Sequence, residues 1–211
     1  MATKFWGPLG WMTLHSVAAI YPTEPTQEER LILEQFVNLF RDCITCVHCK
    51  GHFTGMLNMY KRQHPEWSSS RYHFFLFVCR AHNTVNRRLD KPIIPTLNEC
   101  IDTLKNATKV TTATQYRNAY MNYLIQNWSR EFTGDGAIAL GFARQLKQIN
   151  DEYFNPRDKG YDNIYFFENG SVTEFISEDP KNYHVGENLP NAVSLPHVKI
   201  GFRNGKLRLR Q

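Results

Sequence analysis

The sequence predicts an α+β fold, in which an N-terminal bundle of four helices plus a short fifth is followed by a smaller mixed domain with helices and two β-hairpins. Two observations predict it. Apolar residues repeat with a helical period over the first hundred residues, whereas after Tyr161 they follow strand-like patterns separated by turn signals. The 211 residues, 42% of them apolar, suffice for a packed core. We expect two domains, 1–108 and 109–211.

The N-terminal domain carries five helix signals. In two of them, apolar residues follow the i, i+3, i+4, i+7 spacing of an amphipathic helix. Thr96 and Glu99 have capping-box spacing, in which the hydroxyl and the carboxylate each bind a free backbone N–H group. The signals cover 11–18, 33–40, the stretch after Cys46 until His64-Pro65, about Ser70 to Asp90, and a short fifth helix from Thr96.

The C-terminal domain has weaker helix signals, at 116–128 and 137–149. Its strand signals form two pairs. Segments 164–167 and 172–176 flank the turn residues 168–171. A second pair, 198–202 and 207–209, flanks Asn204-Gly205, a dipeptide that supplies the two positive φ angles of a type I′ turn. Two β-hairpins are therefore expected here.

Charge is concentrated at the C-terminal end. The last fifteen residues hold five basic residues and no acid, which accounts for the whole net charge of +5. A solvated cationic face on the last hairpin is the simpler interpretation, and docking of an acidic protein or nucleic acid is the alternative. No run of about 18 apolar residues and no basic-then-apolar start occurs, so we expect a soluble intracellular protein without a membrane span or signal peptide.

Three of the five cysteines lie within seven residues, at Cys43, Cys46 and Cys49. They allow three interpretations: buried inert thiols, a redox-active Cys46–Cys49 disulfide, or a metal site. Thr45 is the expected N-cap of the following helix, whose first turn would lower the pKa of both thiols. A zinc site would normally need a second C-x-x-C pair, which is absent, although ligands could come from His48, His52, Cys79 or His82.

A polar stripe runs along the predicted fourth helix. Cys79, His82, Asn83 and Asn86 stand at i, i+3, i+4 and i+7, so they share one face. Amide and imidazole groups among core residues need hydrogen-bond partners. The stripe therefore predicts contact with water or with a polar ligand.

Three blocks of sequence, in order, resemble the FAD-linked sulfhydryl oxidases of the Erv/ALR type. The blocks are Trp6-Gly-Pro-Leu-Gly-Trp11 continuing to Pro22, Cys46-Val-His-Cys49-Lys-Gly-His52-Phe53, and Cys79 to Pro92, which contains H-N-x-V-N-x-x-L-x-K-P. The resemblance implies a four-helix bundle that holds FAD, with a short fifth helix, usually as a homodimer. Members from large DNA viruses carry extra domains, so the resemblance also suggests a viral protein, located in host cytoplasm and possibly in the virion.

The same resemblance assigns roles to residues. It implies that Cys46 and Cys49 are catalytic, that Trp11 and His15 face the flavin, and that Gly7 allows close backbone approach. No Gly-x-Gly-x-x-Gly motif follows a predicted strand, so helices must hold the FAD. The remaining implied cofactor-binding residues are Cys79, His82, Asn83, Val85, Asn86, Leu89 and Lys91.

The implied reaction is the oxidation of protein dithiols. Substrate would exchange with Cys46, Cys49 would face the flavin, and electrons would pass through FAD to O2 to give H2O2. The sequence departs from the family because no cysteine follows Lys91-Pro92 directly. The additional Cys43 could pair with Cys100, compete with Cys49, or stay a buried thiol. The alternative function is a metal-stabilised adaptor with a basic C-terminal docking surface.

Overall fold

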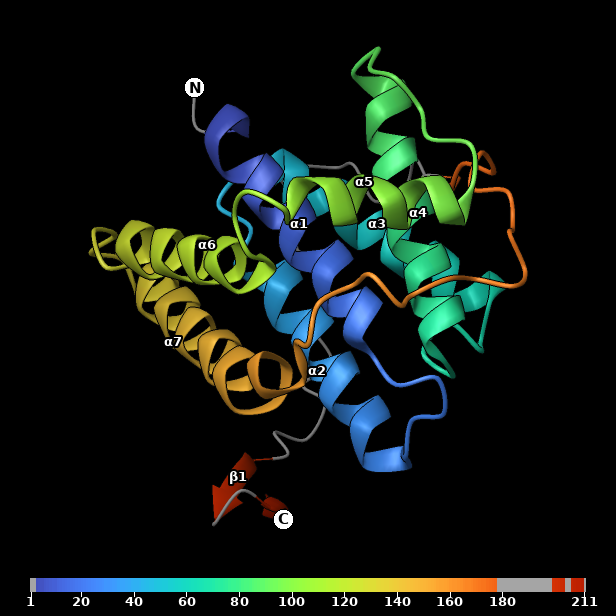
Figure 1. The fold of residues 1–211 in the computed structure, drawn as a ribbon. Helices are drawn as coiled ribbons and strands as arrows, with labels where there is room; N and C mark the ends of the chain where they lie inside the picture. Colours follow the sequence, from blue (N-terminus) through green and yellow to red (C-terminus); the bar gives the residue numbers. More distant parts are fainter. Residues whose placement is uncertain (1–2, 178–198, 204–205, 211) are drawn as a thin grey trace.

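The computed structural model describes residues 3–177, 199–203 and 206–210, and its fold is mainly helical (Figure 1). Helices are present in all five N-terminal segments where they were predicted and in both C-terminal ones. The helices are α1 (Thr3–Ile20), α2 (Gln27–Asp42), α3 (Val47–Gln63), α4 (Arg71–Arg88), α5 (Leu97–Ala107), α6 (Ala113–Trp128) and α7 (Gly134–Ile149), followed by the π-helical turn η1 (Asn150–Phe154) and the 3₁₀ turn η2 (Asn155–Arg157).

Side-chain caps explain where several helices begin. Thr26 and Glu29 form a reciprocal capping box at the start of α2. The Ser70 hydroxyl accepts a hydrogen bond from the His73 N–H at the start of α4, and Thr96 caps α5 in the same way. These hydrogen bonds satisfy backbone donors that the first helical turn leaves free.

Helix α1 lies at the centre of the molecule. It packs against α4 and α5 on one side and against α6 on the other, while α7 packs on α2 and α6 (Figure 1). One hydrophobic core runs through both halves, since Phe36, Phe75 and Phe154 all belong to it. The division into domains at residue 108 stays a prediction.

Arg117 of α6 is the largest fully buried side chain and joins the C-terminal helices to α1. Its guanidinium pairs with Asp158 at 2.8 Å and donates to Ser16 Oγ at 3.1 Å. It also donates to Asn150 Oδ1 at 3.0 Å and to Asn155 Oδ1 at 2.9 Å. The charge is therefore both paired and hydrogen-bonded, as a buried charge must be.

The hairpin predicted at 164–167 and 172–176 is wrong. This segment instead runs in an extended, irregular path across α4 and α5 (Figure 1). Its backbone groups bond to other parts of the chain: Phe166 N and O pair with the Asn98 amide, and Val172 N donates to Pro95 O. The alternating apolar residues that resembled strands are alternating contacts with the helices, because Phe166 and Val172 are buried against the core.

The α+β class is also wrong, because segment 164–176 forms no hairpin and few strand residues remain in the described part of the chain. Towards the C-terminal end, β1 (Lys199–Arg203) and β2 (Lys206–Arg210) pair antiparallel, with Gly201 opposite Arg208. A two-stranded ladder of this length does not make an α+β architecture. The predicted Asn204-Gly205 turn and the side chains of the expected cationic face lie outside the described residues.

Within the described ranges, no helix combines the length and the apolar character needed to cross a lipid bilayer.

Candidate functional site

A cavity of about 600 Å³ lies between α1, α3, α4 and α5. Aromatic and aliphatic side chains form most of its wall, and the polar part includes histidines, lysines and Asn86. Among the described residues no Asp or Glu lines it. Its volume and lining are those of a site for a large aromatic ligand with an anionic part. The cavity contains nine of the residues singled out from the sequence, Gly7, Trp11, His15, Cys49, His82, Val85, Asn86, Leu89 and Lys91.

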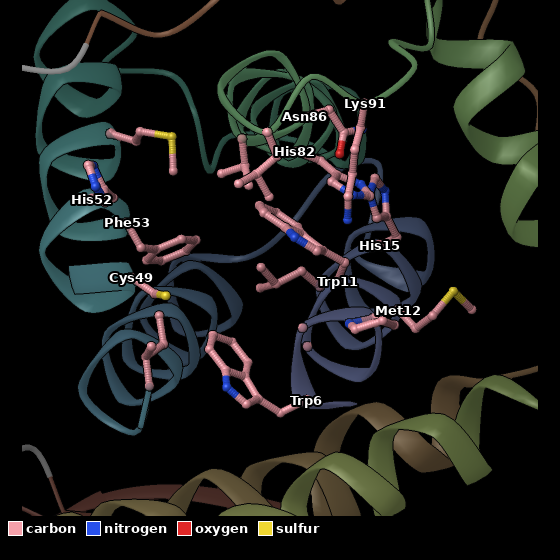
Figure 2. A pocket seen from close by; sticks show the side chains of 18 of the residues that line it. Trp6, Trp11, Met12, His15, Cys49, His52, Phe53, His82, Asn86 and Lys91 are labelled. Carbon is pink, nitrogen blue, oxygen red and sulfur yellow. The ribbon is translucent and has the colours of Figure 1, made fainter. Parts of the chain in front are cut away.

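The two ends of the cavity differ in chemistry. Figure 2 shows Lys91, Asn86, His82 and His15 on one side, and Cys49 with Phe53 and Trp6 on the other. Helices α1 and α4 supply the polar side, whereas α3 supplies the sulfur. A ligand that spans the cavity would therefore meet the Lys91 ammonium and polar rings at one end and a disulfide sulfur at the other.

Trp11, His15 and His82 form a cluster of rings between α1 and α4. The Trp11 ring stacks on His82 with centroids 4.3 Å apart and an interplanar angle of 12°. His15 Nε2 lies 2.9 Å from His82 Nδ1, so one ring donates a proton and the other accepts it. Burial, followed by the nearby His82, holds the pKa of His15 well below its usual range. Burial, followed by the charge of Lys91, lowers the pKa of His82 to about 4.

These shifts predict a loss of stability in mild acid. A histidine with its folded pKa near 4 is neutral in the native protein but takes up a proton in the unfolded chain below about pH 6.5. The contribution of neutral His82 to the free energy of unfolding is thus fully present above pH 6.5 and is lost as the pH drops towards 4. Between pH 7 and pH 5 the free energy of unfolding falls by about 2 kcal/mol for His82 alone. Urea unfolding at the two pH values measures it.

His82→Gln is expected to flatten this pH dependence, because the glutamine cannot titrate. Equal slopes in the wild-type protein and the variant would contradict the assignment.

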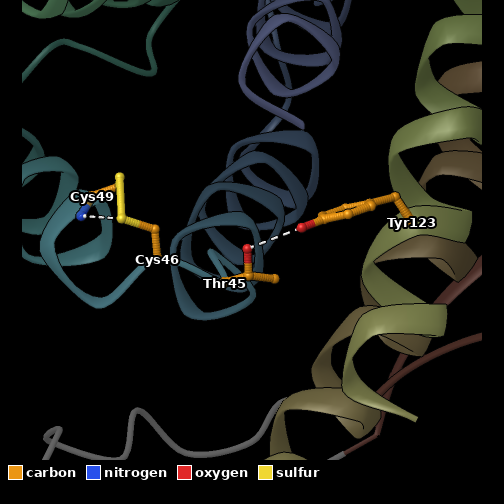
Figure 3. The surroundings of a disulfide bond; sticks show 4 residues. All are labelled: Thr45, Cys46, Cys49 and Tyr123. Atoms are coloured by element: carbon orange, nitrogen blue, oxygen red, sulfur yellow. Dashed lines mark hydrogen bonds between the residues drawn. A yellow bond between two sulfur atoms is a disulfide. The ribbon is translucent and has the colours of Figure 1, made fainter. Parts of the chain in front are cut away.

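Cys46 and Cys49 form a disulfide at the start of α3, with their Cα atoms 5.2 Å apart (Figure 3). The residue that caps this helix is Cys46, not Thr45 as predicted. Cys46 Sγ accepts a hydrogen bond of 3.2 Å from the Cys49 N–H, whereas Thr45 Oγ1 lies 3.4 Å from the Tyr123 hydroxyl of α6. The helix begins one residue later than expected, and the Thr45 side chain contacts Tyr123 in place of the helix.

The two sulfurs differ in their surroundings. Cys49 lines the cavity and Cys46 does not. The residues between them, Val47 and His48, are exposed. A thiolate at either position would gain from the N–H groups and the positive dipole end of the first turn of α3.

Asn83 and Cys79 are not brought into the cavity. The Asn83 amide is buried, donates to Ile94 O at 2.7 Å and to Val172 O at 2.9 Å, and accepts from Ile94 N at 3.2 Å. This side chain is therefore used to hold the loop after α4 and the extended segment 161–177. The polar stripe on α4 finds part of its partners within the protein.

Asn83→Ala is expected to lower the free energy of unfolding by about 2 kcal/mol or more, because two carbonyls and one N–H lose their partner in a buried place. Asn86→Ala, its control on the same helix, removes one exposed bond to Pro92 O and should cost about 0.5 kcal/mol. Urea unfolding of both variants makes the comparison. Similar losses in the two would show that Asn83 has no such structural role.

The other three cysteines are free and buried. Cys43 is a buried thiol, and burial, followed by the nearby Asp42, raises its pKa to about 12. Burial holds the pKa of Cys79 well above its usual range, and contact with the Cys100 thiol adds to this. Cys79 Sγ lies 4.0 Å from His15 Nδ1, and Cys100 lines the cavity.

Several cavity residues were not predicted as site residues. Trp6 stands beside Gly7 in the first block, and its buried indole N–H has no hydrogen-bond partner within the described structure. Phe53 and Met56 share an apolar face of α3, a pattern that core residues also show. That face lines the cavity, and the helical period alone does not separate the two cases.

The described residues contain no group of three or more His, Cys, Asp or Glu side chains placed to hold a metal ion. Cys46 and Cys49, the first candidate ligands, are bonded to each other. The metal-stabilised interpretation of the cysteine cluster is therefore not favoured.

Comparison with known proteins gives consistent matches over the first half of the chain. The model of the Erv1 / Alr family matches residues 9–107. The FAD-linked sulfhydryl oxidase ERV1 of Oryza sativa subsp. japonica is 35% identical over 42% of this chain and 44% of its own length. The mitochondrial FAD-linked sulfhydryl oxidase ERV1 of Saccharomyces cerevisiae is 37% identical over 41% and 43%.

A viral protein is matched over more of its length. The probable FAD-linked sulfhydryl oxidase R368 of Acanthamoeba polyphaga mimivirus is 32% identical over 50% of this chain and 72% of its own length. By contrast, the chain spans less than half the length of the rice and yeast relatives. The matched part contains α2 to α5 and most of α1, and leaves out α6 and α7.

Proposed function

This chain belongs to the Erv1/Alr family, and on that basis we propose that it is an FAD-dependent thiol oxidase that forms disulfides in protein substrates. One observation carries the proposal. The Cys46–Cys49 disulfide stands at a helix N-terminus with Cys49 in the wall of a large, mainly apolar cavity. A disulfide in that position can take electrons from a thiol outside and release them to a group inside.

Features of the cavity fit FAD. The buried Trp6 N–H lacks a partner in the described structure and can donate to a polar atom of a bound ligand. The Lys91 ammonium and the Asn86 amide, on the side away from the sulfur, suit a pyrophosphate. The neutral His82 and the Trp11 ring offer flat faces for an aromatic base. A Cβ at Gly7 would meet no atom within 4 Å and would project into free space beside the ligand.

We propose that thiol exchange takes place at Cys46. A substrate thiolate attacks Cys46 Sγ, the Cys46–Cys49 bond breaks, and Cys49 leaves as a thiolate. The second substrate thiolate then attacks the substrate sulfur of the mixed disulfide, so the substrate leaves oxidised and Cys46 becomes a thiolate. The hydrogen bond from the Cys49 N–H to Cys46 Sγ stabilises this anion.

Cys49 is the sulfur of the pair that would face a bound cofactor, because its side chain lines the cavity. When bound, FAD would supply the transfer of the electron pair from the dithiol to dioxygen, which becomes hydrogen peroxide. The apolar wall beside the sulfur, including Phe53, would limit the access of water when a ligand fills the cavity. The homodimer implied by the family resemblance and the virion or cytoplasmic location stay predictions.

The test is the purified protein itself. We expect it to show a flavin spectrum, to consume oxygen in the presence of dithiothreitol, and to produce one hydrogen peroxide per disulfide formed. A colourless protein that neither takes up added FAD nor oxidises the dithiol would overturn the proposal. Zinc at one ion per chain in that colourless protein would point to the metal-stabilised adaptor instead.

A further inference from the structure

The segment that connects α2 to the disulfide is held by helices beyond the family match. Cys43 to Thr45 precede Cys46 directly, and α3 begins only at Val47. The Trp128 indole Nε1 donates to Cys43 O at 3.0 Å. The Tyr123 hydroxyl lies 3.4 Å from Thr45 Oγ1 (Figure 3). Both side chains belong to α6, whereas the family model ends at residue 107.

The bonds from Trp128 and Tyr123 are made to a backbone carbonyl and a side-chain hydroxyl, both of which need hydrogen-bond partners. Cys43 is the C-cap of α2, and the last carbonyls of a helix have no partner within it. Trp128 supplies that partner from the neighbouring helix. Thr45 would otherwise be free to cap α3, as its sequence position predicts. With Tyr123 bound to Thr45, the capping position passes to the sulfur of Cys46.

The segment before the disulfide contacts α7 as well as α6. The Cys43 thiol lies 3.8 Å from Ala139 O of α7, and its side chain is fully buried. Tyr123 also packs on Phe5 of α1, with ring centroids 5.8 Å apart. The segment before the disulfide is therefore fixed on the side facing α6 and α7, while Lys50 of α3 bonds to Asp42 O at the end of α2.

We propose that Tyr123 and Trp128 are positioning residues for the Cys46–Cys49 disulfide. By fixing Cys43 and Thr45, these two side chains keep Cys46 at the first turn of α3. There the Cys46 sulfur accepts a hydrogen bond from the Cys49 N–H and stays within bonding distance of the Cys49 sulfur. A fixed pair of sulfurs has a high effective concentration, which favours the disulfide over the dithiol. The catalytic consequence rests on the proposed function, whereas the effect on the dithiol–disulfide equilibrium does not.

The test measures that equilibrium directly. Wild-type protein, Tyr123→Phe, Trp128→Phe and the double variant are equilibrated in dithiothreitol buffers of graded potential, and the reduced fraction of Cys46 and Cys49 is read by alkylation and mass spectrometry. We expect the double variant to be about tenfold easier to reduce, a shift of about 30 mV to less negative potential. Each single variant should show a smaller shift in the same direction.

Tyr120→Phe is the matched control. Tyr120 lies on the same helix and is fully buried, but its hydroxyl has no hydrogen-bond partner within the described structure. Loss of that hydroxyl should leave the potential unchanged. Thermal unfolding of the reduced proteins shows whether any variant is merely less stable.

The outcomes separate the two proposals. An unchanged potential in the double variant, with only stability lowered, would overturn the positioning role. A shifted potential in a protein that never binds FAD would keep that role and overturn the oxidase. If both hold, kcat should fall several-fold in the double variant while the flavin content stays at the wild-type level, because a dithiol with a less negative potential is re-oxidised less readily.

Discussion

Replacement of Cys49 by serine is expected to lower thiol oxidation by at least about a thousandfold, the scale seen when a covalent nucleophile is removed. Of the two disulfide sulfurs, Cys49 is the one that lines the cavity, so the variant would lack the dithiol sulfur that faces a bound cofactor. Oxygen consumption with dithiothreitol, measured on flavin-loaded protein, gives the rate. An active Cys49→Ser protein would contradict the assignment of this sulfur.

The same variant should trap substrate. Cys46 remains as a thiol that can form a mixed disulfide with an oxidised partner, but no second sulfur can release it. Cys46→Ser should form no such adduct, although it keeps the cavity sulfur. Non-reducing electrophoresis and mass spectrometry of the two variants after incubation with a disulfide-containing peptide distinguish them. Cys43→Ala, at a buried thiol outside the cavity, is the control and should stay active.

Replacement of Arg117 by methionine is expected to cost about 3 to 5 kcal/mol of unfolding free energy. The change leaves the Asp158 carboxylate, 9% exposed, without its cation and removes donors to Ser16, Asn150 and Asn155. A buried charge that loses its partner carries its full desolvation penalty. Urea unfolding followed by circular dichroism measures the loss.

Two further variants test the origin of this cost. Arg117→Met combined with Asp158→Asn should lose less than the sum of the single losses, because the unpaired carboxylate is gone. Arg144→Met, at an exposed position on α7, should change stability by less than about 0.5 kcal/mol. A cost below about 1 kcal/mol for Arg117→Met would show that the buried network does not hold α6 to α1.

The helices were predicted well because the residues that determine where they begin lie close together in the sequence. Thr26 and Ser70 cap helices in the structure through bonds that span three residues, and such bonds can be read from spacing. The cavity residues on α1 and α4 could also be predicted from spacing, because residues three or four positions apart lie on the same face of a helix. The stripe from Cys79 to Asn86 was therefore located on the right helix.

The structure holds what the sequence pattern did not indicate where a distant partner decides the contacts. Tyr123, 78 residues away, takes the Thr45 hydroxyl and moves the cap of α3 to Cys46. Asn83 has the residue type of a ligand-binding group, but Ile94 and Val172 occupy its amide. Alternating apolar residues at 164–176 pack on helices and not on a partner strand. Sequence periodicity indicates which side chains are buried but does not indicate which elements of the fold cover them.

The extended segment 161–177 also has a consequence for how the chain reaches its native state. The bond from Asn83 to Val172 spans 89 residues, and that from Thr84 to Ile176 spans 92. Contacts of such long sequence separation form late, because the intervening loop must first be closed. We therefore expect Asn83 and Thr84 of α4, which borders the cavity, to gain these partners only after residue 176 has been synthesised.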